Sequence, residues 1–297
     1  MKLIIIIMTF NEEIHLKRCI ESLQNLKAEI LVVDSFSTDR TIEIARNSGA
    51  QILQHQFLNH ANQFNWALEQ LNSNFDWVLR IDADEVLTTE LCDEINNRLS
   101  LLSSDVSGVL VNRSIIFQGN LIKYGGVKTK ILRLFRFGRG KFENRCMDEH
   151  AIVAGKIIQF NGDLFDNNLN SLTWWINKHN KYASLEAVEL LDLKYKFITR
   201  DLKEQYNFSF HTKCTRWLKE RVYFNLPIGF RAFIYLIYRY VFRFGILDGN
   251  AGWTFHFLQG FWYRHLVDLK VAEVKKYKSI KGVDIKTAIH DVLGIIV

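Results

Sequence analysis

The first hundred residues alternate short apolar runs with stretches in which apolar residues recur every three or four positions. An uninterrupted apolar run predicts a buried strand, and the three-to-four spacing predicts a helix with one buried face. The predicted strands are residues 3–8, 29–34, 50–54 and 77–81, and the predicted helices are residues 12–26, 41–47 and 60–71. This order is typical of an α/β fold with a doubly wound, mostly parallel sheet that binds ligands beyond the carboxyl ends of its strands.

The next hundred residues continue the pattern less regularly. They predict a helix near 90–101, strands at 106–117, 130–137 and 151–159, and a turn at 146–150. Basic and apolar residues alternate in 130–137, which is typical of a strand with one polar face. From Leu172 onward the spacing is helical, and we place the change of domain near residue 200, between 1–200 and 201–297.

Charge and aromatic residues separate these two regions. The chain has 297 residues and a net charge of +6. Residues 1–200 carry 23 Lys and Arg against 24 Asp and Glu, whereas residues 201–297 carry 15 against 8 and hold 20 of the 39 aromatic residues. With 48% hydrophobic residues the chain is too apolar for a disordered protein. We therefore expect a near-neutral folded domain followed by a basic, aromatic extension.

The amino-terminal apolar run has the composition of a signal peptide, but it is short. Glu12 and Glu13 follow it where a cleavage site would need small residues. No stretch reaches the roughly 18 uninterrupted apolar residues of a membrane span. The four cysteines are too far apart for a zinc or redox pair and indicate isolated thiols in a reducing compartment. We expect a cytoplasmic protein that does not cross the bilayer.

Acidic residues stand at the ends of two predicted strands. Asp82 and Asp84 flank one residue after the strand 77–81, where they suit a hard divalent cation such as Mg²⁺ or Mn²⁺. The alternative is a solvated acidic turn. Asp34 ends the strand 29–34, where its carboxylate could accept hydrogen bonds from a nucleobase or cap the next helix. Residues 9–12 follow the first strand and would line the same crevice.

A third cluster, Asp148-Glu149-His150, falls in the predicted turn. A carboxylate in a partly desolvated site can have a raised pKa and serve as a general base. An ordinary acidic turn is the alternative interpretation.

Taken together, these segments resemble the family 2 glycosyltransferases, inverting enzymes of the GT-A fold. Four stretches carry the resemblance: residues 6–13 after the first strand, residues 32–41 around Asp34, residues 62–68, and the Asp82-Ala83-Asp84 motif. Later stretches are similar to the branch that acts in bacterial lipopolysaccharide, capsule and exopolysaccharide synthesis. They are residues 132–136, 148–150, 174–183, 247–249 and 257–264.

The resemblance implies a GT-A domain over 1–200, with nucleotide-sugar binding over about 1–105 and the acceptor side over about 106–200. It implies a glycosyltransferase of the hexosyltransferase type with a nucleotide-diphosphate sugar as donor, a UDP-sugar being favoured. Asp84 would hold the Mg²⁺ or Mn²⁺ ion, with Asp82 and His150 as further metal residues. Glu149 would be the catalytic base, with Asp148 as the alternative. The implied donor-nucleotide residues are Thr9, Phe10, Asn11, Glu12, Asp34, Asn65 and Asp82.

The extension is densest in basic and aromatic residues over 213–244, where Pro227-Ile228-Gly229 predicts a break between two helices. Arginines interrupt its apolar run, so the helix suits the membrane interface, with its rings at headgroup depth and its arginines on anionic lipid. Packing within a helical domain is the alternative. Nucleic-acid binding is not expected, because no nucleic-acid motif accompanies the basic residues.

We therefore expect a metal-dependent glycosyltransferase, peripheral on the inner face of the bacterial cytoplasmic membrane, that acts on a glycan or glycolipid acceptor. Two other classes stay open. A nucleotidyltransferase would share the sheet and the metal but normally needs a Gly-rich basic loop, and residues 8–13 contain neither Gly nor Lys. A catalytically degenerate membrane scaffold would keep the tail and lack activity.

Overall fold

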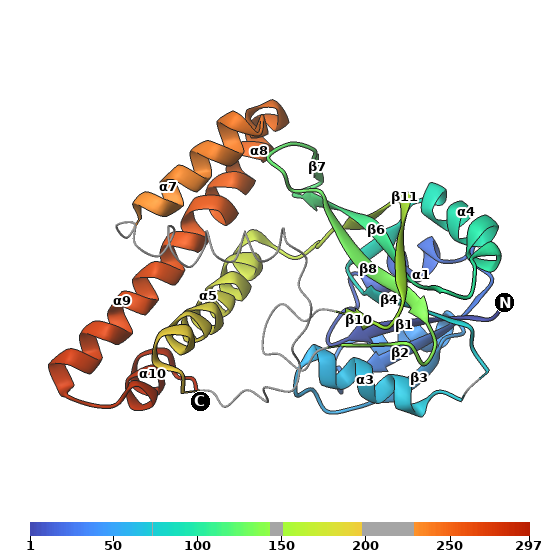
Figure 1. Ribbon diagram of the computed structural model, residues 1–297, viewed down its shortest axis with the longest axis horizontal. Helices are drawn as coiled ribbons and strands as arrows, with labels where there is room; N and C mark the ends of the chain where they lie inside the picture. Colours follow the sequence, from blue (N-terminus) through green and yellow to red (C-terminus); the bar gives the residue numbers. More distant parts are fainter. Residues whose placement is uncertain (73, 143–150, 198–228) are drawn as a thin grey trace. The chain divides into compact units, whose positions relative to one another are not determined.

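The computed structural model describes residues 1–72, 74–142, 151–197 and 229–297 (Figure 1). Two compact units make up the chain, Met1–Leu169 and Asn170–Val297. The division comes after Leu169 and not near residue 200, because helix α5 (Leu172–Tyr195) packs on helices of the second unit. The predicted turn at 146–150 and the predicted break at 227–229, apart from Gly229, lie outside the described residues.

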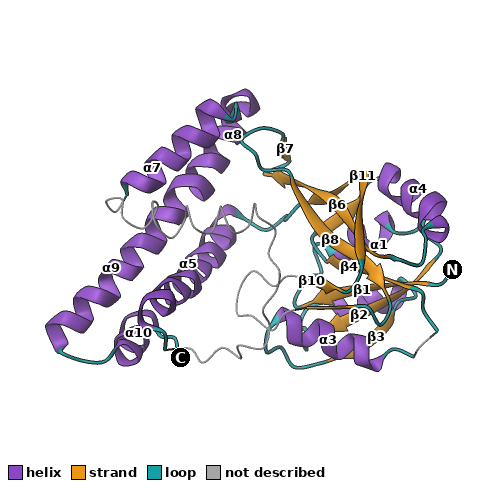
Figure 2. Cartoon of the chain, in the orientation of Figure 1, coloured by secondary structure: helices purple, strands orange, loops and turns teal. Residues whose placement is uncertain are grey.

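A mixed sheet forms the first unit, with strands in the order β3-β2-β1-β4-β8-β6-β11-β5 and β7 paired to β6 (Figure 2). The first four strands in this order, β3, β2, β1 and β4, are parallel, as predicted. Strand β8, however, runs antiparallel to both β4 and β6, and β5 runs antiparallel to β11. Strands β6 and β11 are again parallel, so the sheet is mixed, and the prediction of a mostly parallel sheet is correct only in part. The strands are β1 (Leu3–Thr9), β2 (Ala28–Asp34), β3 (Gln51–Gln54), β4 (Trp77–Asp82), β5 (Glu85–Leu87), β6 (Val106–Phe117), β7 (Asn120–Ile122), β8 (Thr129–Arg136) and β11 (Lys156–Asp166), with β9 (Gly140–Phe142) and β10 (Ala151–Val153) forming a separate pair.

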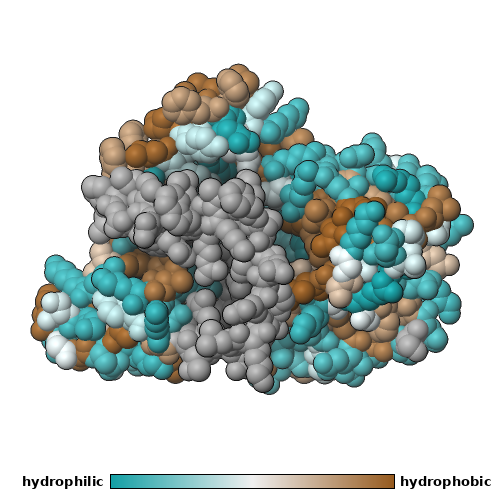
Figure 3. Space-filling view, viewed as in Figure 1, coloured by the Kyte–Doolittle hydropathy of each residue, from teal (hydrophilic) through white to brown (hydrophobic). Residues whose placement is uncertain are grey.

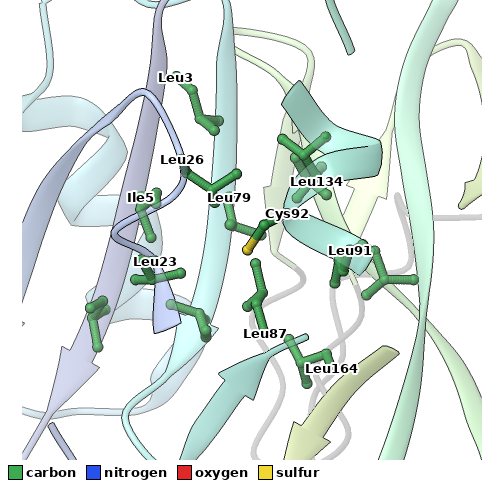
Figure 4. Close-up of a cluster of buried hydrophobic side chains, with 14 of the residues drawn as sticks. Leu3, Ile5, Leu23, Leu26, Leu79, Leu87, Leu91, Cys92, Leu134 and Leu164 are labelled. Atoms are coloured by element: carbon green, nitrogen blue, oxygen red, sulfur yellow. The ribbon is translucent and has the colours of Figure 1, made fainter. Parts of the chain in front are cut away.

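Helices cover both faces of this sheet because β1 is apolar at every position but its last. Alternate side chains of a strand point to opposite faces, so Ile5 and Ile7 join one buried cluster and Ile4 and Ile6 join another. The first cluster lies under α1 (Leu16–Ser22), α2 (Thr41–Asn47) and α4 (Thr89–Arg98), and Figure 4 shows part of it. The second lies under α3 (His60–Gln70). The carboxyl ends of β1, β2 and β4 are thereby held at one edge.

Sequence periodicity misplaced several boundaries. The predicted helix 12–26 is shortened to α1, because residues 12–15 form a turn that enters the helix. The predicted strand 151–159 is two strands, β10 and β11, separated at Gly155, whose φ of 132° is unfavourable for residues with a Cβ. Strands β5, β7 and β9, each three residues long, were not predicted. The predicted helix near 90–101 is α4 followed by a short 3₁₀ segment, η1 (Leu99–Leu101).

The second unit is helical. Besides α5, its elements are α7 (Phe230–Ile237), the π-helical η3 (Tyr238–Phe242), the 3₁₀ turn η4 (Gly245–Asp248), α8 (Gly249–Phe255), the π-helical η5 (His256–Trp262), α9 (Tyr263–Lys281) and α10 (Ile285–Leu293). Ala183 and Ala187 of α5 pack against Val267 of α9. The buried Arg231 of α7 donates to Asp268 of α9, with Nε 2.6 Å from Oδ2. In the described part of the chain, no helix has the length and apolar character needed to cross a membrane.

Candidate functional site

The loops that follow β1 and β2 are joined around Asp34. This carboxylate is fully buried, accepts hydrogen bonds from Thr9 Oγ1 (3.0 Å) and from the Ser37 backbone N–H (2.8 Å), and also binds the Ser37 hydroxyl. The first N–H group of α2, that of Thr41, donates at 3.0 Å to Asp39 and not to Asp34. Asp34 therefore joins the loops after β1 and β2 through its hydrogen bonds to Thr9 and Ser37.

Asn11 makes the second connection between these loops. Its φ of 55° is left-handed, a conformation that Asn tolerates better than most residues. Its N–H donates to Ser37 Oγ (2.8 Å), and its Oδ1 accepts from the Thr38 N–H (2.9 Å). The neighbouring Phe10 and the left-handed Phe36 (φ 60°) are 58% and 55% exposed. The joined loops thus present two aromatic rings beside a buried carboxylate.

Glu12 anchors the beginning of α1. Its backbone N–H donates to Thr41 Oγ1 at 2.8 Å, and its carboxylate lies 2.5 Å from Nδ1 of the fully buried His15. The Leu169 N–H donates to His15 Nε2 at 2.8 Å. Because Nε2 accepts, the ring proton resides on Nδ1 and is donated to Glu12.

Two arginines surround the first carboxylate of the Asp82–Asp84 pair. Arg133 of β8 donates to Asp82 Oδ2 at 2.9 Å and also to Glu85, while Arg80 Nη2 lies 3.5 Å from Asp82 Oδ1. Burial would raise the pKa of Asp82, but the charges of Arg133 and Arg80 outweigh it and hold that pKa well below its usual range. Asp82 is thus ionised and already paired.

Asp84, the second carboxylate, has a different environment. Its Oδ2 accepts from Asn168 Nδ2 at 3.0 Å, and its backbone oxygen accepts from the Asn167 N–H at 3.0 Å. Arg18 of α1 interacts electrostatically with this carboxylate, but among the described residues no arginine or lysine makes a direct ion pair with it. Of the two acids, Asp84 is the better placed to bind a cation.

The carboxylates of Asp82 and Asp84 are oxygen ligands of the kind that suit a magnesium-like ion. The described ranges contain no cluster of three or more His, Cys, Asp or Glu residues of the kind that encloses a metal. Mg²⁺ is usually held by one or two carboxylates, several waters and substrate phosphates, and so needs no such cluster. His150, predicted as a metal residue, and Asp148 and Glu149, predicted as bases, lie outside the described residues.

Asn65 is the predicted nucleotide residue that the structure places elsewhere. Its amide accepts from the Phe142 N–H and donates to the Phe142 carbonyl, both at 2.9 Å, so it ties α3 to β9. Gln63 of the same helix reaches the end of β2 instead, donating to Ser35 Oγ at 2.7 Å and to the Val33 carbonyl at 3.1 Å. Helical geometry explains the difference, since residues two apart on a helix point in different directions.

Sequence reasoning missed Glu85, His15 and Asn168 as members of this site, and interpreted Arg133 only as part of the polar face of a strand. The alternation in 130–137 was a usable signal, because an arginine between apolar neighbours in a central strand needs an acidic partner. No local pattern marks His15 or Asn168, because His15 binds Leu169, 154 residues further along the chain, and Asn168 binds Asp84, 84 residues before it.

The joined loops and Asp84 lie at the carboxyl ends of parallel strands, which is where open α/β sheets bind their ligands. Comparison with known proteins identifies the class. Residues 4–145 match the model of glycosyl transferase family 2. An uncharacterized glycosyltransferase of Rickettsia typhi is 30% identical over 248 residues, covering 77% of this chain and 79% of the relative.

A lipopolysaccharide core biosynthesis glycosyltransferase, LpsC of Rhizobium meliloti, is 32% identical over 200 residues, covering 61% of this chain and 68% of the relative. The solved structure of Staphylococcus aureus TarS residues 1–349 is 15% identical and covers 99% of this chain and 91% of that one, with a TM-score of 0.44. The chain belongs to glycosyltransferase family 2 and is a glycosyltransferase.

Proposed function

We propose that this protein is a metal-dependent, inverting glycosyltransferase that takes a sugar from a nucleotide-diphosphate donor. The observation that carries the proposal is the placement of Asp84, an acid that makes no direct ion pair with a described residue, at the same sheet edge as the joined β1 and β2 loops. A UDP-sugar is the favoured donor. The exposed rings of Phe10 and Phe36 offer apolar surface on which a nucleobase can stack.

Asp84 and, beside it, Asp82 would hold a Mg²⁺ or Mn²⁺ ion together with the donor diphosphate. When bound, such an ion supplies Lewis-acid stabilisation of the charge that develops on the leaving diphosphate. Arg133 and Arg80 keep Asp82 ionised and oriented. Glu149, or Asp148 in its place, would remove the proton of the acceptor hydroxyl as that oxygen attacks the anomeric carbon from the face opposite the leaving group.

A panel of nucleotide sugars, each assayed with Mn²⁺ and with Mg²⁺, tests this proposal directly. We expect nucleoside diphosphate release and thermal stabilisation with at least one UDP-sugar, and neither in EDTA. Equal stabilisation by all nucleotides with and without metal, and no release from any donor, would contradict it.

Replacing the proposed base is expected to lower turnover. General-base catalysis contributes about 100-fold or more, so Glu149→Gln should reduce kcat by about that factor, with donor affinity unchanged. Asp148→Asn is the matched variant, and the larger loss identifies the base. Full transfer by both variants would remove these residues from the mechanism.

We further propose that the acceptor is lipid-linked and that the enzyme acts in bacterial surface polysaccharide or lipopolysaccharide synthesis, peripheral on the inner face of the cytoplasmic membrane. The similarity to LpsC supports the pathway. An exposed apolar surface of the second unit supports the membrane contact, and Figure 3 shows apolar residues gathered there. We call the exposed apolar residues of the segment 230–257 the apolar tip: Phe230, Phe233, Ile234, Tyr238, Val241, Phe242, Phe244, Ile246, Leu247, Trp253 and Phe257.

The apolar tip includes a reversal of the chain that exposes large apolar side chains. The helix formed by α7 and η3 ends at Phe242, the chain reverses through Phe244 (φ 61°) and η4, and α8 returns. Phe242 and Leu247, at this reversal, are 68% and 62% exposed. Exposed apolar patches of this kind mark protein or membrane contacts. The exposed Arg243 beside them suits anionic headgroups.

Substitutions at the apolar tip are therefore expected to weaken vesicle binding. Burying a Phe or Leu side chain contributes about 1.5–3 kcal/mol when complete, so the double variant Phe242→Ser, Leu247→Ser should bind phosphatidylglycerol-containing vesicles about tenfold or more weakly in a sedimentation assay. Leu101→Ser, at a 79% exposed position of the first unit, is the matched control. Wild-type protein that stays in the supernatant would overturn the membrane proposal.

A further inference from the structure

Three consecutive residues after β11 connect Asp84 to the first loop of the crevice. We call Asn167–Leu169 the strap. The antiparallel pairing of β11 with β5, in which Asp166 lies opposite Glu85, brings the strap alongside Asp84. Asn167 and Asn168 bind Asp84 and Leu169 binds His15, so a short segment distant in sequence reaches both the Asp84 turn and the loop after β1.

The backbone of Asn167 is held on both sides. Its N–H donates to the Asp84 carbonyl at 3.0 Å, and its carbonyl accepts from Arg18 Nη2 of α1 at 2.6 Å. The Asn168 side chain donates through Nδ2 to Asp84 Oδ2 at 3.0 Å. One of the two oxygens of the Asp84 carboxylate is thereby given a fixed direction, and the orientation of the other follows from it.

The far end of the strap is fixed by a buried histidine. The Leu169 N–H donates to His15 Nε2, and His15 Nδ1 donates to the carboxylate of Glu12. The backbone N–H of Glu12 in turn donates to Thr41 Oγ1 of α2. His15 is fully buried, so its ring has little freedom to reorient. The chain of contacts therefore runs from the β1 loop through His15 and the strap to Asp84.

We propose that Asn168 is a positioning residue for Asp84, and that the Glu12–His15 pair positions the strap that carries Asn168. This inference rests on the proposed role of Asp84 in binding a cation with the donor. Partners that orient a metal-binding carboxylate change metal affinity or activity by about 10–100-fold when they are removed. Asn168 acts on the direction of the carboxylate and does not itself touch the ion or the nucleotide.

The test compares two neighbouring asparagines in the full-length protein. Mn²⁺ affinity is measured by titration in the presence of UDP, UDP affinity is measured in EDTA, and the melting temperature reports folding. We expect Asn168→Ala to weaken Mn²⁺ binding by about 10–100-fold with little change in UDP affinity or melting temperature. Asn167→Ala is the matched control, since the strap contacts of Asn167 run through its backbone, and it should leave Mn²⁺ affinity within about twofold.

His15→Ala should weaken Mn²⁺ binding in the same direction, and His15→Gln, whose side-chain amide can both accept and donate, should recover part of the loss. Mn²⁺ affinity that is equal in the Asn168→Ala and Asn167→Ala variants would overturn the positioning role while leaving the proposed function standing. Wild-type protein that binds no Mn²⁺ with UDP would instead overturn the proposed function, and this inference with it.

Discussion

Arg133→Met is expected to lower the free energy of unfolding by about 3–5 kcal/mol, the usual result of removing one partner from a buried ion pair. Arg133 is the buried cation that donates to both Asp82 and Glu85. Methionine fills similar space without charge, so the two carboxylates would remain close together with only Arg80 near Asp82. Urea denaturation monitored by tryptophan fluorescence measures the loss.

The pH dependence of this loss separates electrostatics from packing. Burial raises the pKa of Glu85, the charge of Asp82 adds to it, and Arg133 opposes both. In the variant the charge of Arg133 no longer lowers the pKa of Glu85, so the folded-state pKa of Glu85 lies further above its unfolded value. An acid of that kind destabilises the fold increasingly as pH rises from the unfolded to the folded pKa. We therefore expect a larger loss at pH 8 than at pH 5.

Arg98→Met is the control for this measurement. Arg98 pairs with Glu94 on the surface of α4, with nearly half of its side chain exposed, and such a pair contributes about 0–1 kcal/mol. Adding Glu85→Gln to Arg133→Met should recover part of the stability, because the buried Glu85 carboxylate that lost its partner is then replaced by a neutral amide. A loss that does not vary with pH and is not recovered would point to packing as the role of Arg133.

Asp84→Asn is expected to reduce glycosyl transfer by about 1,000-fold. A cation that stabilises a leaving group contributes several kcal/mol to catalysis, and each 1.4 kcal/mol, approximately, is a factor of ten in rate. Asparagine keeps an oxygen that can accept from Asn168 Nδ2, so the strap contact is preserved while the negative charge is lost. Release of the nucleoside diphosphate from the active donor at saturating Mn²⁺ is the measurement.

Asp105→Asn is the matched control for Asp84, since Asp105 is an exposed acid in the turn before β6. UDP affinity in EDTA should be unchanged in both variants, because the contacts that join the β1 and β2 loops do not involve Asp84. Activity of the Asp84→Asn variant within a few-fold of wild type would exclude this residue as the main support of the cation.

Local patterns predicted the elements on which the site is built. The apolar run at residues 3–8 and the acids that follow the strands 29–34 and 77–81 are visible in the sequence, because a strand buried on both faces has to be continuously apolar and its polar ends have to lie at the sheet edge. Thr9, Asn11, Asp34 and Asp82 were expected at this edge and are found there. The predicted role of Asn65 depended on the orientation of a side chain on α3, which the residue spacing did not specify.

The sequence by itself determined that this is an α/β protein of glycosyltransferase family 2 with an acidic pair after its fourth strand and a basic, aromatic carboxyl-terminal region. Only the tertiary structure decided which acid of the pair is available, because Arg133 arrives from an antiparallel strand and Asn168 from the segment after β11. It also decided that α5 belongs with the helical unit. The reason is physical: charge pairing and packing depend on distances in space between residues far apart along the chain, and local hydrophobic periodicity contains no information about those distances.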